Sequence, residues 1–129
     1  MKRPEIKTIL ILGASYGLLP GAKLSLAGHA VTLVGRGDEI AIMAKTSLEV
    51  RITPRRPGDD IVLRVPVAAR AAGGHIALAT PDAIDPSSFD FVILAMQEPQ
   101  YSDSAVAALM ARIAASARPC LSIMNLAPP

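Results

Sequence analysis

Two stretches near the N-terminus decide the fold: Thr8-Ile-Leu-Ile-Leu-Gly-Ala-Ser-Tyr-Gly17 and Gly28-His-Ala-Val-Thr-Leu-Val-Gly-Arg36. In them an apolar run ends in a glycine turn, a segment of helical length stops at a glycine, and a second apolar run ends in a basic residue. This order is typical of a β-α-β unit that binds a dinucleotide. Backbone N–H groups in such a turn and at the following helix approach the pyrophosphate. The predicted pyrophosphate-binding residues are Gly13, Ala14, Ser15, Tyr16 and Gly17.

The surrounding residues predict buried strands that alternate with helices. Apolar runs indicate strands over Lys7–Leu12 and Ala30–Gly35, and a helix over Tyr16–Ala27 between them stops at Gly28. A short helix is expected next over Asp38–Ser47, because acidic residues near its start complement the helix dipole.

The middle of the chain changes character. Leu48–Thr53 and Ile61–Val67 are strand-like and flank a turn with proline and glycine, which indicates an antiparallel hairpin. The elements expected after it are a strand over His75–Ala79, a loop or helical turn over Ala83–Ser88, a buried strand over Phe91–Met96, a helix over Asp103–Ser116 and a strand over Pro119–Met124. The predicted fold class is α/β: a Rossmann-like, doubly wound, mostly parallel sheet with an antiparallel hairpin excursion, in one domain over residues 1–129.

Composition narrows the class of protein. Of the 129 residues 51% are hydrophobic, so one domain can bury a sizeable core. A net charge of +2 is too small to indicate nucleic acid binding, and no apolar run approaches the ~20 residues of a membrane span. We therefore expect a soluble, cytoplasmic protein with a small-molecule ligand and neither nucleic acid nor membrane as a partner.

Few side chains have the pattern of metal ligands or nucleophiles. Cys120 is the single cysteine, which excludes an internal disulfide, and its apolar neighbours in sequence predict a buried, inert thiol. His29 and His75 lack acidic or cysteine neighbours at ligand spacing, so no metal site is expected. No serine lies in the sequence context of a hydrolase nucleophile.

Arg36 is the most discriminating single residue for the cofactor. An acidic residue at the end of the second strand holds the ribose hydroxyls of NAD, whereas arginine there suits the 2′-phosphate of NADP(H). A solvated loop arginine is the alternative reading. The nearby Asp38 and Glu39 could bond a ribose hydroxyl or simply start the next helix. The glycine turn itself lacks the second glycine of G-x-G-x-x-G, so an ordinary turn that binds nothing stays open as well.

Further candidate residues follow the two later strands, at the edge where α/β sheets bind ligands. Ala95 and Met96 end the Phe91–Met96 strand and Gln97 follows it, and all three are predicted to contact the cofactor. Asn125 follows the last strand, and its amide could bridge cofactor and substrate or could only form a turn. No catalytic residue is assigned beyond this possible contact of Asn125.

The order of these motifs resembles the N-terminal domain of the ketopantoate reductases, or 2-dehydropantoate 2-reductases. Ile9–Gly13 with Gly17 is similar to the opening strand and turn of that family. Gly28–Arg36 resembles its second strand, in which the arginine reads NADPH. Further matches are the Leu48–Val67 hairpin, the strand Phe89-Asp-Phe-Val-Ile-Leu-Ala95 and the ending Ser122-Ile-Met-Asn125.

The chain also departs from this family. Its glycine turn is one residue shorter, which bears on how tightly it binds a pyrophosphate, and Gln97 stands where the family carries a lysine. Leu126 follows Asn125 where the family has glycine. The helical second domain, which in the family supplies the catalytic lysine, is not among these residues. The chain ends on Pro128-Pro129 just after a strand, so we expect a domain of a longer protein.

The resemblance implies an NADP(H)-binding domain of an oxidoreductase that transfers hydride from NADPH to a small 2-oxo acid. By itself this domain is expected to be inactive, and its exposed edge is expected to favour a homodimer. The alternatives are a non-catalytic Rossmann-like binding domain and the N-terminal domain of an opine or 6-phosphogluconate type of dehydrogenase.

Overall fold

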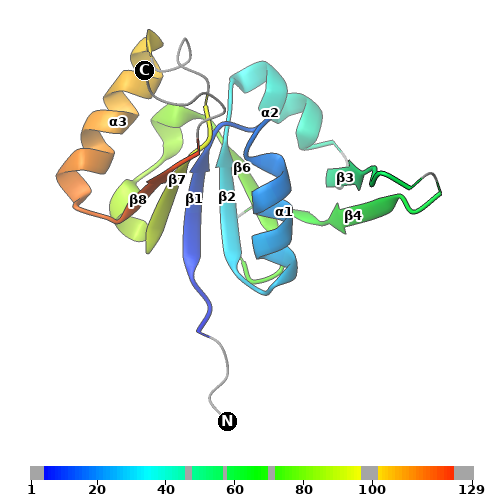
Figure 1. Ribbon diagram of the computed structural model, residues 1–129. Coiled ribbons are helices and arrows are strands. Elements are labelled where there is room, and N and C mark those ends of the chain that lie inside the picture. The colour runs from blue at the N-terminus through cyan, green and yellow to red at the C-terminus, as the bar shows by residue number, and fades with distance from the viewer. Residues whose placement is uncertain (1–4, 46–47, 57, 70–71, 97–101, 124–129) are drawn as a thin grey trace.

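The fold was analysed in a computed structural model, which describes residues 5–45, 48–56, 58–69, 72–96 and 102–123. A six-stranded sheet has the order β5-β6-β2-β1-β7-β8, and every pair of neighbours in it is parallel. A separate two-stranded antiparallel sheet is formed by β3 and β4. Figure 1 shows this hairpin projecting from the body of the domain. The predicted fold class, Rossmann-like α/β with a hairpin excursion, is confirmed.

The elements alternate as the apolar runs predict. The strands are β1 (Thr8–Leu12), β2 (Ala30–Val34), β3 (Leu48–Ile52), β4 (Ile61–Val65), β5 (Val67–Ala68), β6 (Ile76–Ala79), β7 (Phe91–Leu94) and β8 (Cys120–Ser122). The helices are α1 (Leu18–Leu26), α2 (Gly37–Met43) and α3 (Ser104–Ser116), with short 3-10 turns η1 (Pro81–Ala83) and η2 (Pro86–Ser88). In the part of the chain that is described, no helix is long and apolar enough to cross a membrane.

Strand β1 lies at the centre and is buried on both faces. Ile9 and Ile11 point into a cluster with α1 and the base of the hairpin, whereas Leu10 and Leu12 point into a second cluster with α3. The two layers lie on opposite sides of the sheet (Figure 1). Because alternate side chains of a strand face opposite sides, a strand covered on both faces needs an unbroken apolar run, which residues 9–12 provide.

The end of the hairpin differs from the prediction. The strand expected over Ile61–Val67 ends at Val65, because Pro66 has no N–H to continue the ladder. Val67 and Ala68 form β5 instead, which pairs in parallel with β6 at the edge of the main sheet. The carbonyl of Pro66 accepts the N–H of Ile76 at 3.0 Å and starts this pairing. The excursion therefore returns directly into the main sheet.

Two further expectations need correction. Helix α1 begins at Leu18 and not at Tyr16, because Gly17 is its N-cap, and Pro20 falls in its first turn, where a missing N–H costs least. Cys120 is exposed and not buried, since β8 is an edge strand whose three residues are all exposed. Partial desolvation still raises the pKa of the Cys120 thiol, so the thiol is not activated. Strand β8 begins at Cys120, one residue after the predicted start at Pro119. The predicted end, Met124, lies outside the described residues.

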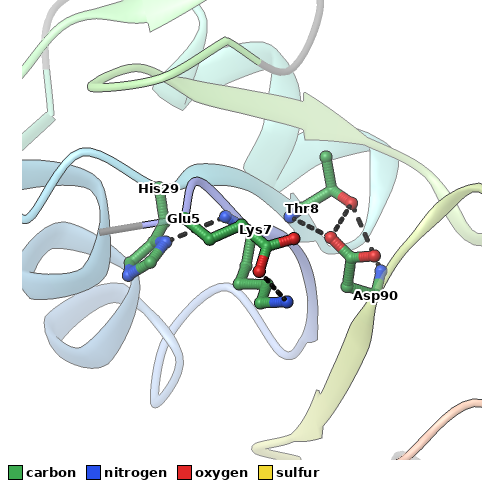
Figure 2. A network of polar contacts seen from close by, with 5 residues as sticks. All are labelled: Glu5, Lys7, Thr8, His29 and Asp90. Carbon is green, nitrogen blue, oxygen red and sulfur yellow. Dashed lines mark hydrogen bonds and ion pairs between the residues drawn. The ribbon is translucent and has the colours of Figure 1, made fainter. Parts of the chain in front are cut away.

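The amino ends of the central strands are tied together by polar contacts (Figure 2). One carboxylate oxygen of Asp90 accepts the backbone N–H of Thr8 at 2.9 Å and its hydroxyl at 3.0 Å. Nearby, Nδ1 of His29 accepts the N–H of Lys7 at 3.1 Å. These contacts hold together the amino ends of β1, β2 and β7, opposite to the glycine turn. They give His29 a structural role.

The Asp90 contact predicts a pH-dependent stability. The hydrogen bonds from the backbone and the hydroxyl of Thr8 hold the pKa of the Asp90 carboxyl below its ordinary value. Its contribution is therefore complete above the unfolded pKa of about 4 and is lost as the pH falls through the lower folded pKa. We expect Asp90→Asn to be less stable than wild type near pH 7 and to converge with it in acid. Urea unfolding between pH 2.5 and 7 measures this, and a pH-independent difference would contradict it.

Ser25 is a buried polar group whose removal should stabilise the protein. It lies on α1 with no exposed surface, and its Oγ has no hydrogen-bond partner among the described residues. Ser25→Ala should therefore raise the free energy of unfolding by about 1 kcal/mol. The same change at Ser116 is a matched control, because that hydroxyl donates to the Ile113 carbonyl and accepts from the Arg118 N–H. Thermal unfolding should show a gain at position 25 and none at position 116; a loss at position 25 would refute the argument.

Candidate functional site

The turn after β1 is built so tightly that it excludes side chains at two positions. Gly13 has a φ of +108°, and a Cβ there would lie 2.8 Å from the carbonyl carbon of Ala95 and even closer to its oxygen. A Cβ at Gly17 would overlap the Gly13 carbonyl and the side chain of Ile11. The N–H of Gly17 donates to the Gly13 carbonyl at 2.9 Å and starts α1 directly after the turn. The local geometry therefore requires glycine at both positions.

The carboxyl ends of the parallel strands meet at this turn. The N–H of Gly13 donates to the Val34 carbonyl at 2.9 Å, and that of Ala95 donates to the Leu12 carbonyl at 2.8 Å. In the same way Gly35 donates to the Ala79 carbonyl at 3.1 Å. The chain segments that leave β1, β2, β6 and β7 thus lie next to one another at one edge of the sheet, where open α/β sheets bind their ligands.

A cleft of about 520 Å³ opens at this edge. Gly13 and Ala14 contribute the glycine turn, and residues 34–37 with Glu39 contribute the end of β2 and the start of α2. The opposite wall consists of residues 80–82 after β6, together with Met96 and the first turn of α3. The cleft is large enough for part of an extended dinucleotide, since ligand pockets commonly span about 300–1,000 Å³.

Arg36 reaches this cleft from the end of β2, where the sequence places it. Its guanidinium is not isolated: Nε lies 3.2 Å from Oε1 of Glu39 and 3.5 Å from Oδ1 of Asp38. The same Glu39 oxygen accepts the backbone N–H of Arg36 at 3.3 Å, as in a helix capping box. The Arg36 side chain is 74% exposed, so its outer nitrogens are accessible from solvent. Glu39 thus caps the start of α2 and also lines the cleft, whereas its bond to a ribose hydroxyl stays a prediction.

Two more carboxylates line the cleft. The Thr80 hydroxyl, the backbone of Asp82 and the charge of Arg112 lower the pKa of the Asp82 carboxyl, in that order of effect. Asp103 caps α3 by accepting the N–H groups of Ala105 at 2.9 Å and Val106 at 3.2 Å. Among the described lining residues, one arginine therefore shares the cleft with three carboxylates: Glu39, Asp82 and Asp103.

The structure brings together part of the predicted site. Gly13, Ala14, Arg36 and Met96 line the cleft. Gly17 is buried below the turn and Ala95 is buried beside it, whereas Ser15 and Tyr16 are exposed on the turn and do not line the cleft. Gln97 and Asn125 lie outside the described residues. The binding roles of all these residues stay predictions.

The sequence reasoning missed other lining residues. Thr80, Asp82 and Asp103 reach the cleft only through the strand order and through the packing of α3. A local signal existed for Asp103 as a helix N-cap, but it did not point to a ligand. Within the described residues, no three or more His, Cys, Asp or Glu side chains group together in a way that could hold a metal ion. His75 contacts the carbonyl of Gly73 through Nδ1 at 3.2 Å.

A parallel sheet of this order, with a glycine turn and a cleft at its carboxyl edge, defines the chain as a Rossmann-like domain. The family model described as ketopantoate reductase PanE/ApbA matches residues 9–125. The chain therefore belongs to the ketopantoate reductase PanE/ApbA family, whose members are oxidoreductases that use NADPH. The resemblance that the sequence motifs indicate is confirmed.

A solved structure supports the fold. The chain is similar to the crystal structure of the putative 2-dehydropantoate 2-reductase from Enterococcus faecalis, with a TM-score of 0.60 and 20% sequence identity. The match covers 94% of this chain and 34% of the other, so this chain spans about a third of the length of that protein. A search of curated proteins finds no significant match.

The tight turn makes a direct prediction. Gly13→Ala should lower the free energy of unfolding by about 2–4 kcal/mol, because it combines a positive φ with an overlap against the Ala95 backbone. Gly37→Ala is the matched control: Gly37 also lines the cleft, but a Cβ there meets nothing within 4 Å. Urea unfolding of both variants tests this, and equal stabilities would show that the turn can relax.

Proposed function

We propose that this chain is the NADP(H)-binding domain of a reductase that acts on a small 2-oxo acid. The observation that carries the proposal is the cleft itself, whose lining combines a turn without room for a Cβ at Gly13 with Arg36. A backbone surface without side chains suits the close approach of a pyrophosphate, and a guanidinium suits a phosphate on the ribose. Membership of a family that uses NADPH supports the same assignment.

In this proposal the residues of the chain bind and orient. The backbone of residues 13–17 would hold the pyrophosphate, and Arg36 would hold the 2′-phosphate. Met96, with Gln97 and Asn125, would lie toward the reacting end. When bound, NADPH supplies the hydride that reduces the carbonyl of the substrate. Because the chain spans about a third of the matched solved protein, the proposal places the general acid and most substrate contacts in a second domain. Residues 1–129 alone would then bind the cofactor without turnover. We also propose that two copies of this chain associate as a homodimer.

A non-catalytic binding domain is the second candidate, and one observation favours it. The described lining of the cleft carries three carboxylates and one arginine, which is an unfavourable balance for a polyanionic ligand. Under this alternative the fold is kept and tight dinucleotide binding is lost. Whether NADPH binds at all separates the two candidates.

The proposal predicts a preference for NADPH that depends on Arg36. Wild type should bind NADPH more tightly than NADH, and Arg36→Ala should weaken NADPH binding by about tenfold, or about 1.4 kcal/mol, with little effect on NADH. This loss lies near the lower end of what a charge-assisted hydrogen bond usually contributes, because the carboxylate of Glu39 already contacts Nε of Arg36. Isothermal titration calorimetry with both dinucleotides measures the four affinities.

The hairpin offers a matched control for this experiment. Arg64 has a similar ion pair, with its Nε 3.2 Å from Glu49, but it lies on β4 outside the cleft. Arg64→Ala should leave both affinities unchanged. If Arg36→Ala binds NADPH as tightly as wild type, the assignment of Arg36 to the 2′-phosphate is refuted, and no binding of either dinucleotide by wild type would refute the proposed function.

A further inference from the structure

Glu39 occupies an unusual place for a phosphate-binding cleft. Its Oε1 contacts Nε of Arg36 at 3.2 Å, and its side chain is only 27% exposed. Asp38 contacts the same nitrogen at 3.5 Å, but it is 70% exposed and does not line the cleft. Of the two acidic partners of Arg36, Glu39 is thus the one that a bound ligand would meet.

The two forms of the cofactor respond to Glu39 in opposite ways. A 2′-phosphate carries about 1.5–2 negative charges, so Glu39 repels it and also competes with it for the guanidinium. A free ribose 2′,3′-diol offers two hydroxyl donors instead, and a carboxylate is a good acceptor for both. Arg36 has the reverse preference. The pair therefore combines a group that favours the phosphate with one that favours the diol.

We infer that Glu39 is a specificity-determining residue that narrows the preference of this domain for NADPH over NADH. Its carboxylate competes with the 2′-phosphate for Arg36 and offers acceptors to the ribose hydroxyls of NADH. The inference rests on the proposed function, since it concerns the adenosine end of the same cleft.

The chain offers a clean variant and a matched control. Glu39→Gln removes the charge but keeps an oxygen that can accept the Arg36 N–H, and Gln serves as well as Glu at this position of a capping box. Glu49→Gln removes the same charge from a pair of the same length, Arg64 Nε to Glu49 at 3.2 Å, on the hairpin and outside the cleft. Asp38→Asn tests the exposed partner of Arg36 in the same way.

The experiment compares dissociation constants for four ligands: NADPH, NADH, adenosine 2′,5′-bisphosphate and adenosine 5′-monophosphate. In Glu39→Gln the ratio of Kd for NADH to Kd for NADPH should rise by about three- to tenfold, with tighter NADPH and unchanged or weaker NADH. The two adenosine phosphates should show the same shift, since they differ in the 2′-phosphate and lack the nicotinamide. Asp38→Asn should shift the ratio less, and Glu49→Gln should leave it unchanged.

The outcomes separate the inference from the function on which it rests. If wild type binds both dinucleotides and Glu39→Gln leaves the ratio unchanged or lowers it, the inference is overturned and the proposed function stands. An equal shift in Glu49→Gln also overturns it, because the effect would then be one of overall charge. If wild type binds neither dinucleotide, both fail. Circular dichroism verifies folding, and Glu39→Ala gives the same comparison if the glutamine variant does not fold.

Discussion

The close approach of the Gly13 α-carbon to the Ala95 carbonyl governs the arrangement of this domain. The backbones of the two segments meet without an intervening side chain, so β1 and β7 pair up to their last residues. The positive φ of Gly13 turns the chain sharply out of the sheet, and Gly17 then starts α1 by donating to the Gly13 carbonyl. With a side chain at Gly13, the turn would have to move away from Ala95 after β7; with one at Gly17, the start of α1 would have to move away from the Gly13 carbonyl and Ile11.

The central elements could be predicted from the sequence because their signals are local. Strands covered on both faces require nearly continuous apolar runs, and β1, β2 and β7 have them apart from Thr8 at the start of β1 and Thr32 within β2. Strand β5 could not be predicted in this way, since two residues after Pro66 carry no periodicity, and their partner β6 is set by tertiary packing. The exposure of Cys120 depends on β8 being the edge of the sheet, and strand order is not encoded in the residues of β8 themselves.

As with the fold, the part of the candidate site that has a local sequence signal could be predicted, and the part that depends on tertiary packing could not. Gly13 and Arg36 follow the ends of strands, so their place at the ligand-binding edge follows from the fold class alone. Asp82 and Asp103 come from a 3-10 turn and from a helix N-cap that are distant in the sequence, and they meet only because β6 lies beside β2 while α3 covers the other face. The sequence shows each acidic residue but not that three of them share one cleft.

Each of these three carboxylates already has a partner within the protein. Glu39 accepts from Arg36, Asp82 from Thr80, and Asp103 from the first N–H groups of α3, so each stabilises a local turn or helix start. Their hydrogen-bonding capacity is partly used, but their negative charge still acts on a ligand in the cleft. Screening confines that effect, because the Debye length at physiological ionic strength is about 8 Å. Arg64, on the projecting hairpin, does not line the cleft and is already paired with Glu49. The charge that an anionic ligand meets is set by these three carboxylates, by Arg36 and by nearby cations such as Arg112, which acts on Asp82, so side chains that shape the turns also adjust which ligand the cleft prefers.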